Sequence, residues 1–411
     1  MKYRLEFDGR PISGIFKLPA SKSISNRLLI LEKLSENRIK SKNLSKSADT
    51  QELIQVLSDL QQSINTGNGG TSTRFIIAFL STLPGTWTVS ASGGMEKRPI
   101  SGLVDALINL GAEIKYLEKD NHLPIQIIGG NITKNKVAVS AQVSSQYISA
   151  LLLIAPSLPN GLQINLIGKI VSRPYIEMTL TILRQLGVDC LWKKNRITVS
   201  SNSIQSMTFL IENDWSAASY WYSIAALSKN SCIELLGLDT ESMQGDAAVA
   251  AIFKQLGVDT EFTKRGIIIK NNFVKNDHLK IDFLDFPDIA PTIITTATAL
   301  GITGTYTGLD TLEKKESKRI DALKKELSKI GAIVETSLQN KIEIKEINAI
   351  KNNNILIETY GDHRMAMAFA PLVTVMSSIV ISNPKVVEKS YPDFWNELKK
   401  AGIRIDEINE P

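Results

Sequence analysis

A short phrase with a central glycine recurs along the chain at intervals of about 70 residues. It reads LGAEI at residues 110–114, LGVDC at 186–190, LGVDT at 256–260, IGAIV at 330–334 and AGIRI at 401–405. A stretch with the apolar periodicity of an amphipathic helix precedes the phrase, and residues suited to a strand follow it. Each copy therefore predicts a helix that is closed by a left-handed glycine and leads into a strand.

A weaker copy, LQQSI at residues 60–64, brings the number of repeats to six. One such unit cannot bury its apolar face alone, so neighbouring units must pack on one another. The interval is too long for a solenoid, and 411 residues are too many for one ordinary core. Chance recurrence is the alternative, but five matches at a near-constant interval favour a true repeat. We therefore predict an α/β fold of two pseudo-three-fold domains, with three units in each.

Composition argues against several kinds of partner. The longest apolar run, residues 368–381, is shorter than the roughly 20 residues that span a bilayer, and it contains Pro371. The first residues, MKYRLE, resemble neither a signal peptide nor a transit peptide. A net charge of +5 and an aromatic content of 6% provide no basic stripe with interleaved aromatic residues. We expect a cytoplasmic protein with no membrane or nucleic-acid partner.

Cysteine and histidine residues are few and far apart. Cys190 and Cys232 cannot form a disulfide framework, and their apolar neighbours predict that both are buried in the core. The three histidines and two cysteines show no metal-ligand spacing, so we expect no metal site.

Three motifs in the first half place hydroxyl, glycine or amide residues at the expected starts of helices. They are LPASKSISNR at residues 18–27, GNGGTSTR at 67–74 and SSQY at 144–147. The unsatisfied N–H groups of a helix N-terminus bind anions, and glycines let them approach a phosphate closely. Arg98 is held extended by Pro99, which suits an arginine that reaches an oxyanion. For each motif alone, a plain capped helix, a tight turn or a surface arginine remains the alternative.

Two motifs in the second half carry both signs of charge. KESKR at residues 315–319 precedes a helix, and YGDHRMAMA at 360–368 leads three polar residues into an apolar helix. Asp288 lies among apolar residues in the sequence. Its carboxylate is therefore expected to be either a desolvated base or a helix cap. Asp288 and Glu316 are the two carboxylates placed to act as acid or base. Cationic residues at element starts are Lys22, Arg27, Arg74, Arg98, Arg173, Lys315, Arg319, Arg364 and Lys389.

This inventory suits anionic substrates and proton transfer without a metal or redox cofactor. The motifs, in this order and over nearly the whole chain, resemble those of the 5-enolpyruvylshikimate-3-phosphate synthase family. The resemblance implies an inside-out α/β barrel fold, in which each domain has three βαβαββ-like subunits. It also implies a discontinuous domain of residues 1–18 and 213–411 and an inserted domain of residues 19–212.

The resemblance implies a transferase of the shikimate pathway, which leads to chorismate and the aromatic amino acids. It would transfer the enolpyruvyl group of phosphoenolpyruvate to the 5-hydroxyl of shikimate 3-phosphate through a tetrahedral intermediate, with no cofactor, and we expect a monomer. Catalysis would fall to Asp288, Glu316 and Lys22. Shikimate 3-phosphate would contact Lys22, Ser23, Arg27, Ser144, Ser145, Gln146, Ser172, Tyr175, Asp288 and Lys315. Phosphoenolpyruvate would contact Lys22, Gly70, Arg98, Gln146, Arg319, Arg364 and Lys389.

The chain departs from the family pattern at three positions. Phe75 follows the arginine of the glycine-rich motif, where a proline is common, and Thr311 stands where an asparagine is common. Trp215 stands where smaller residues are usual. Two alternatives remain: the sister transferase that acts on UDP-N-acetylglucosamine, which typically uses a loop cysteine, and a non-catalytic anion-binding α/β protein.

Overall fold

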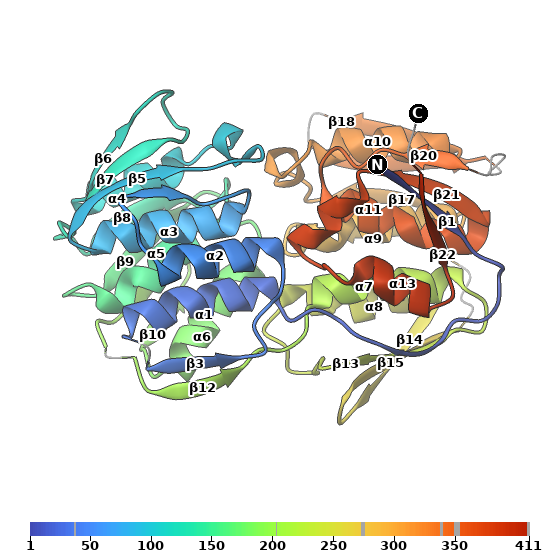
Figure 1. Ribbon diagram of the computed structural model, residues 1–411, viewed down its shortest axis with the longest axis horizontal. Helices are drawn as coiled ribbons and strands as arrows, with labels where there is room; N and C mark the ends of the chain where they lie inside the picture. Colours follow the sequence, from blue (N-terminus) through green and yellow to red (C-terminus); the bar gives the residue numbers. More distant parts are fainter. Residues whose placement is uncertain (37, 203, 273–275, 338–339, 349–353, 409–411) are drawn as a thin grey trace. The chain divides into compact units, whose positions relative to one another are not determined.

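The chain forms two compact units in a computed structural model (Figure 1). The structure describes residues 1–36, 38–202, 204–272, 276–337, 340–348 and 354–408. One unit consists of Met1–Pro19 with Glu212–Pro411, and the other of Ala20–Ile211. The second unit is thus an insertion within the first.

Within the described residues of the inserted unit, two four-stranded sheets have one topology. Two parallel strands are joined through a helix, and a second helix leads to an antiparallel hairpin beside them. A third sheet has two parallel strands, β3 and β12. The strands are β3 (Ile39–Lys42), β4 (Ser63–Asn65), β5 (Gly85–Ser90), β6 (Glu113–Tyr116), β7 (Ile125–Gly129), β8 (Lys136–Ser140), β9 (Leu162–Ile167), β10 (Cys190–Lys193), β11 (Arg196–Val199) and β12 (Met207–Leu210). The helices are α1 (Lys22–Leu34), α2 (Ala48–Ser58), α3 (Gly70–Thr82), α4 (Ser101–Leu110), α5 (Ser145–Ile154) and α6 (Arg173–Gln185).

In the part of the discontinuous unit that the structure describes, the same pattern occurs in three four-stranded sheets, each with two parallel strands beside an antiparallel partner. The first two strands of this unit complete two of these sheets, because β2 pairs with β13 and β1 lies between β21 and β22. The strands are β1 (Lys2–Glu6), β2 (Ser13–Phe16), β13 (Cys232–Leu236), β14 (Val258–Thr263), β15 (Gly266–Asn271), β16 (His278–Asp282), β17 (Thr303–Thr307), β18 (Ala332–Ser337), β19 (Lys341–Ile347), β20 (Ile355–Ile357), β21 (Ser378–Ser382) and β22 (Arg404–Ile408). The α-helices are α7 (Trp215–Leu227), α8 (Val249–Lys254), α9 (Ala290–Ala299), α10 (Arg319–Lys329), α11 (His363–Phe369), α12 (Val373–Met376) and α13 (Phe394–Lys400).

The five clear copies of the repeated phrase all have the predicted local structure. Each glycine follows a helix and has a positive φ, which a residue without Cβ adopts without strain. The strand after each glycine lies at the edge of its sheet. The glycines are Gly111, Gly187, Gly257, Gly331 and Gly402.

The weak sixth copy was interpreted wrongly. The strand that begins within residues 60–64 is β4, which lies at the opposite edge of the sheet from β6, the strand that follows Gly111. Among the described residues, the unit built from α1, β3 and α2 has the parallel pair β12–β3 but no hairpin of its own. After α2 the chain therefore enters the sheet of the next unit, and the glycine phrase is absent there.

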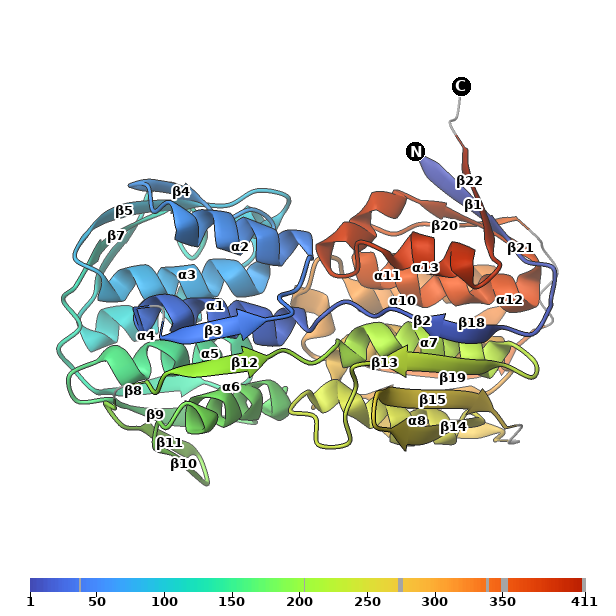
Figure 2. The ribbon, with the colours of Figure 1, turned by 60° about the horizontal axis from the view of Figure 1, so that its bottom comes forward.

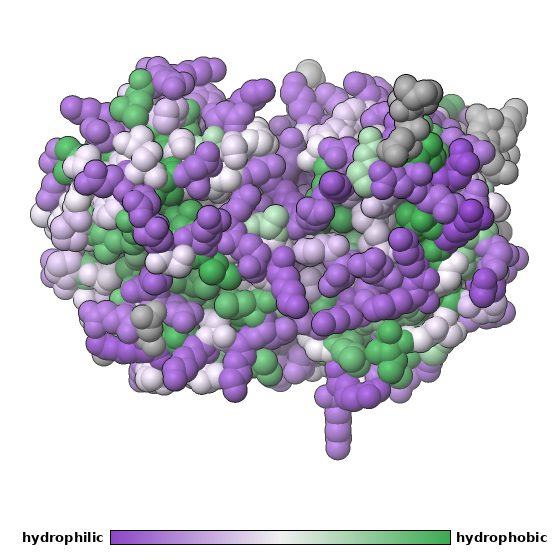
Figure 3. All heavy atoms as spheres, viewed as in Figure 1, coloured by the Kyte–Doolittle hydropathy of each residue, from purple (hydrophilic) through white to green (hydrophobic). Residues whose placement is uncertain are grey.

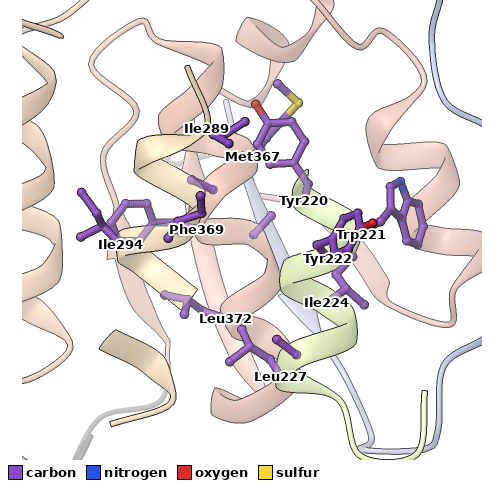
Figure 4. Close-up of a cluster of buried hydrophobic side chains, with 14 of the residues drawn as sticks. Tyr220, Trp221, Tyr222, Ile224, Leu227, Ile289, Ile294, Met367, Phe369 and Leu372 are labelled. Carbon is purple, nitrogen blue, oxygen red and sulfur yellow. The ribbon is translucent and has the colours of Figure 1, made fainter. Parts of the chain in front are cut away.

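Within each unit the most extensively buried helices lie inside and the sheets outside, as Figure 2 shows. In the discontinuous unit α7, α9 and α11 pack against one another. These helices carry side chains that are fully or almost fully buried, among them Tyr220, Trp221, Ile294 and Phe369 (Figure 4). In the inserted unit α1, α3 and α5 pack in the same way. The inside-out α/β arrangement is thus confirmed.

The surface in Figure 3 carries mostly hydrophilic side chains with small apolar areas. No helix of the described residues is long and apolar enough to cross a membrane. The predicted burial of the two cysteines was wrong, since Cys232 is exposed and Cys190 half-buried. Both lie on strands, where alternate side chains point to opposite faces, so apolar neighbours in sequence do not imply burial.

Candidate functional site

Helix α1 begins at Lys22, whose ammonium group pairs with a carboxylate that the sequence analysis did not identify. Lys22 Nζ lies 2.9 Å from Asp49 Oδ2, near the start of α2, and both side chains are largely buried. Ser21, the residue before α1, makes no side-chain cap hydrogen bond. A single acidic residue in the first turn of a helix is common, so the sequence had no signal that distinguished Asp49.

Arg27 lies one and a half turns further along α1 and is almost completely buried, with 2% of its surface exposed. Its Nε donates to Thr179 Oγ1 at 2.7 Å and its Nη2 to the Tyr175 carbonyl oxygen at 2.9 Å, both on α6. Its Nη1 donates to the Ser23 carbonyl oxygen at 2.8 Å. Burial lowers the pKa of Arg27 to about 10, and the guanidinium remains charged at neutral pH. These bonds bring the predicted residues Ser23, Arg27 and Tyr175 together.

The glycine-rich motif, Arg98 and the serine motif meet at the start of α3. Arg74 Nη1 donates to the Gly70 carbonyl oxygen and to Gln146 Oε1, both at 2.8 Å, and Gln146 Nε2 donates to Thr71 Oγ1 at 2.9 Å. A Cβ at Gly70 would lie 2.6 Å from Arg98 Nη1 and 2.7 Å from Arg74 Nη1. A side chain at this position would therefore displace one or both guanidinium groups from the start of the helix.

Three predicted serines lie at the starts of α5 and α6. Ser144 caps α5, because its Oγ accepts a hydrogen bond from the backbone N–H of Gln146 at 3.2 Å, and Ser145 is buried beside it. Ser172 precedes α6 with a φ of 53°, an uncommon conformation for a residue with a Cβ. The hydroxyl residues thus stand at helix N-termini, where backbone N–H groups favour an anion. Arg98 has the extended conformation predicted from Pro99, with φ −87° and ψ 137°.

In the discontinuous unit, Asp288 is the centre of a cationic cluster. Its Oδ1 lies 3.2 Å from Lys315 Nζ and 3.4 Å from Arg319 Nη1, and its Oδ2 lies 2.7 Å from Arg364 Nη2. Burial raises the pKa of Asp288, but Arg364, Lys315 and Arg319 together outweigh burial and hold the pKa well below its usual range. Asp288 is therefore ionised, and serves better as a hydrogen-bond acceptor than as a strong base.

Glu316 lies beside this cluster, shares Arg319 with Asp288 and contacts one further cationic group, Lys389. Its Oε2 lies 2.9 Å from Arg319 Nη2 and its Oε1 lies 3.5 Å from Lys389 Nζ. The side chain keeps 13% of its surface exposed. The structure thus brings together the six residues predicted in the second half: Asp288, Lys315, Glu316, Arg319, Arg364 and Lys389.

Asp362 forms an ion pair with Arg319 of this cluster and was not predicted as a site residue. It is fully buried, and its carboxylate accepts hydrogen bonds from Arg319 Nε at 2.7 Å and from Ser317 Oγ at 3.0 Å. It also caps α11, because its Oδ1 accepts from the backbone N–H of Arg364 at 2.9 Å. The motif around residue 362 was noted in the sequence, but not that its carboxylate binds the side chain of Arg319 and the backbone of Arg364.

Asp246, in the 3₁₀ helix Gly245–Ala248, is a second buried carboxylate that the sequence analysis missed. It accepts a hydrogen bond from the Ser216 hydroxyl, at the start of α7. Burial, and next the charge of Asp288, raise the pKa of Asp246 to about 6, although Arg364 acts in the opposite direction. No sequence motif marks it, since its environment arises from packing.

Replacing Asp246 with asparagine is expected to make the protein more stable at neutral pH. The raised pKa means that the folded state resists ionisation of Asp246, so wild-type stability falls as the pH rises from about 4 to about 6. Asp246→Asn cannot ionise, and its gain should reach about 3 kcal/mol above pH 7, at about 1.4 kcal/mol per pKa unit. Urea unfolding from pH 4 to pH 8 measures this gain in the free energy of unfolding. Asp105→Asn, which changes an exposed aspartate in the same way, is the control. Parallel stability curves for variant and wild type would contradict this expectation.

Among the described residues, no group of three or more histidine, cysteine or acidic side chains could hold a metal ion. The described site residues of each unit instead combine helix N-termini with lysine and arginine groups, an arrangement suited to phosphate and carboxylate groups.

Comparison with known proteins gives consistent results. The family model for EPSP synthase (3-phosphoshikimate 1-carboxyvinyltransferase) matches residues 8–66 and 60–398. A 3-phosphoshikimate 1-carboxyvinyltransferase of Bacteroides fragilis (strain YCH46) is 44% identical over 406 residues, which cover 98% of this chain and 99% of that protein. A 3-phosphoshikimate 1-carboxyvinyltransferase of Vibrio campbellii (strain ATCC BAA-1116) is 32% identical over 417 residues, which cover 94% of this chain and 96% of that protein.

Solved structures show the same fold at lower identity. The EPSP synthase of Acinetobacter baumannii superimposes with a TM-score of 0.78 at 20% identity, covering 99% of this chain and 100% of that one. The enolpyruvyl transferase NikO from Streptomyces tendae superimposes with a TM-score of 0.77 at 12% identity, and the match covers 100% of this chain and 99% of that one.

Proposed function

This chain belongs to the EPSP synthase (3-phosphoshikimate 1-carboxyvinyltransferase) family, and we propose that the two residue clusters described above bind its two anionic substrates. The reaction transfers the enolpyruvyl group of phosphoenolpyruvate to the 5-hydroxyl of shikimate 3-phosphate and releases phosphate. The observation that carries the residue assignment is the cluster in which Glu316 and Asp288 contact four cationic side chains.

Shikimate 3-phosphate is assigned mainly to the inserted unit. The hydroxyl groups and backbone N–H groups at the starts of α5 and α6 suit its phosphate, and the start of α1 adds cationic groups. Asp288 accepts a hydrogen bond from the 5-hydroxyl, since it is ionised, and Lys315 lies beside it. The full set is Lys22, Ser23, Arg27, Ser144, Ser145, Gln146, Ser172, Tyr175, Asp288 and Lys315.

Phosphoenolpyruvate is assigned to cationic groups of both units. Arg319 and Arg364 hold its carboxylate, because guanidinium groups match a carboxylate with paired hydrogen bonds. Its phosphate is assigned to Lys22, Gly70, Arg98, Gln146 and Lys389.

Glu316 is assigned as the acid that protonates the methylene carbon. In this step the 5-hydroxyl oxygen bonds to the central carbon of phosphoenolpyruvate and passes its proton to Asp288, while the proton of Glu316 converts the methylene carbon into a methyl group. Asp288 later gives its proton to the departing phosphate. Elimination breaks the carbon–oxygen bond to phosphate and returns one methyl proton to Glu316, which restores the double bond. Arg319 and Lys389, which contact Glu316, are also assigned to phosphoenolpyruvate, so the bound substrate lies beside the carboxyl group that protonates it. Lys22 neutralises developing charge and is the remaining candidate for proton transfer.

Incubating the protein with phosphoenolpyruvate and shikimate 3-phosphate, without added metal, tests the function. Phosphate should be released in equal amount to the enolpyruvyl product, and omission of either substrate should abolish release. UDP-N-acetylglucosamine in place of shikimate 3-phosphate is the specificity control and should give no phosphate. No release with both substrates present, by protein that unfolds cooperatively, would overturn the assignment. Release with the control acceptor would favour the sister transferase.

We also propose that the protein acts as a monomer in the cytoplasm, without a membrane partner. Its two cysteines are not joined in a disulfide, as is usual for proteins of reducing compartments.

A further inference from the structure

Arg27 is a buried cation with no carboxylate partner within the described part of the chain. Its hydrogen-bond acceptors are the hydroxyl groups of Thr179 and Ser149 and the carbonyl oxygens of Ser23 and Tyr175. These are neutral groups, and an unpaired buried charge is costly. Burial accordingly lowers its pKa to about 10. Something other than an ion pair must help to stabilise the charge.

The aromatic ring of Phe75 is a described contact that can do so. The guanidinium carbon of Arg27 lies 5.4 Å from the centre of the Phe75 ring, within the roughly 6 Å range of a cation–π interaction. Phe75 is completely buried on α3, so solvent does not weaken the attraction. A proline at this position, common in the family, would have no aromatic face.

The residue before Phe75 makes a similar contact with a different helix. The guanidinium carbon of Arg74 lies 5.3 Å from the centre of the Tyr147 ring, on α5. Arg74 also donates to Gly70 and Gln146, which are assigned to phosphoenolpyruvate. Two neighbouring residues of α3 thus connect to α1 and α5, and Phe75 connects to the shikimate 3-phosphate residue Arg27.

The hydrogen bonds of Arg27 leave one donor for a ligand. A guanidinium group has five N–H bonds. The described partners accept one from Nε, one from Nη1 and two from Nη2. The second N–H of Nη1 is therefore available for a substrate, and its direction depends on the plane of the guanidinium group.

We propose that Phe75 is a positioning residue for Arg27 in this chain. Its ring stabilises the buried charge and fixes the guanidinium plane, so that the last N–H of Nη1 is directed to shikimate 3-phosphate. The proposal rests on the assignment of Arg27 to that substrate. Phe75 acts through Arg27, so its loss should weaken shikimate 3-phosphate binding and leave phosphoenolpyruvate binding and the chemical step little changed.

Replacing Phe75 with phenylalanines that carry one, two or five ring fluorines separates charge attraction from packing. Fluorines withdraw electron density from the ring face and change its shape little, and a cation–π interaction weakens accordingly. The dissociation constant of shikimate 3-phosphate, measured by calorimetry without phosphoenolpyruvate, should rise stepwise to about tenfold. The turnover number and the KM for phosphoenolpyruvate should change less than about twofold. Equal dissociation constants across the series would overturn the proposal.

Phe75→Leu and Phe79→Leu form a matched pair of substitutions with natural amino acids. Phe79 is also buried on α3, one turn further along. Phe75→Leu should weaken shikimate 3-phosphate binding about tenfold, whereas Phe79→Leu should leave it unchanged even if it lowers the melting temperature. Equal effects of the two variants would show that the ring serves packing alone. Because binding is measured without turnover, absent phosphate release by the wild type would refute the proposed reaction and not the role of Phe75.

Discussion

Glu316→Gln is expected to bind both substrates with near-normal affinity and to turn over about 10²–10⁴ times more slowly, the usual contribution of a general acid. Glutamine has the same shape and can still accept a hydrogen bond from Arg319 through its amide oxygen. It cannot supply a proton to the methylene carbon. The loss should therefore appear in the turnover number, with little change in KM.

Isotope exchange tests this role more directly than the overall rate. With the wild type in deuterated water, reversible protonation should place deuterium in the methylene group of phosphoenolpyruvate when shikimate 3-phosphate is present. Glu316→Gln should lose this exchange together with turnover. The control is Glu313→Gln, three residues earlier, whose carboxylate accepts a hydrogen bond from the backbone N–H of Ile320. Normal turnover by Glu316→Gln would remove the assigned role.

Asp362→Ala is expected to lower the free energy of unfolding by about 3–5 kcal/mol, the range measured when one partner of a buried ion pair is removed. Arg319 and Asp362 keep 1% and 0% of their side chains exposed. Without Asp362, the guanidinium group stays buried and loses its shortest charge contact, at 2.7 Å. The variant also loses the cap of α11.

Urea unfolding at pH 7 measures this loss, and a surface pair provides the matched control. Lys270 Nζ lies 3.1 Å from Glu261 Oε2, and the two side chains are 51% and 62% exposed. Glu261→Ala should cost at most about 1 kcal/mol, since solvent screens exposed pairs. A loss below 1 kcal/mol for Asp362→Ala would mean that Arg319 can find another partner or water.

Local patterns predicted much of the fold. The five glycines have positive φ, and helices and strands flank them as predicted, because helix closure depends on residues within one or two turns. The exception, residues 60–64, concerned which sheet edge the next strand joins, and that depends on distant strands. The predicted burial of the two cysteines was wrong for a related reason, because a strand has two faces and packing decides which one is covered.

The sequence by itself determined the repeated α/β units, the extended Arg98 and the set of cationic residues at helix starts, because these follow from neighbouring residues. The tertiary structure alone decided how the charges pair. Lys22 contacts Asp49 across 27 residues, Arg319 contacts Asp362 across 43, and Arg364 contacts Asp288 across 76. Which carboxylate approaches which cation depends on how helices pack, and so does the ring of Phe75 against Arg27. Burial then shifts the pKa values of Asp246 and Arg27. Side chains become buried only when the chain folds, so the sequence alone does not indicate these shifts.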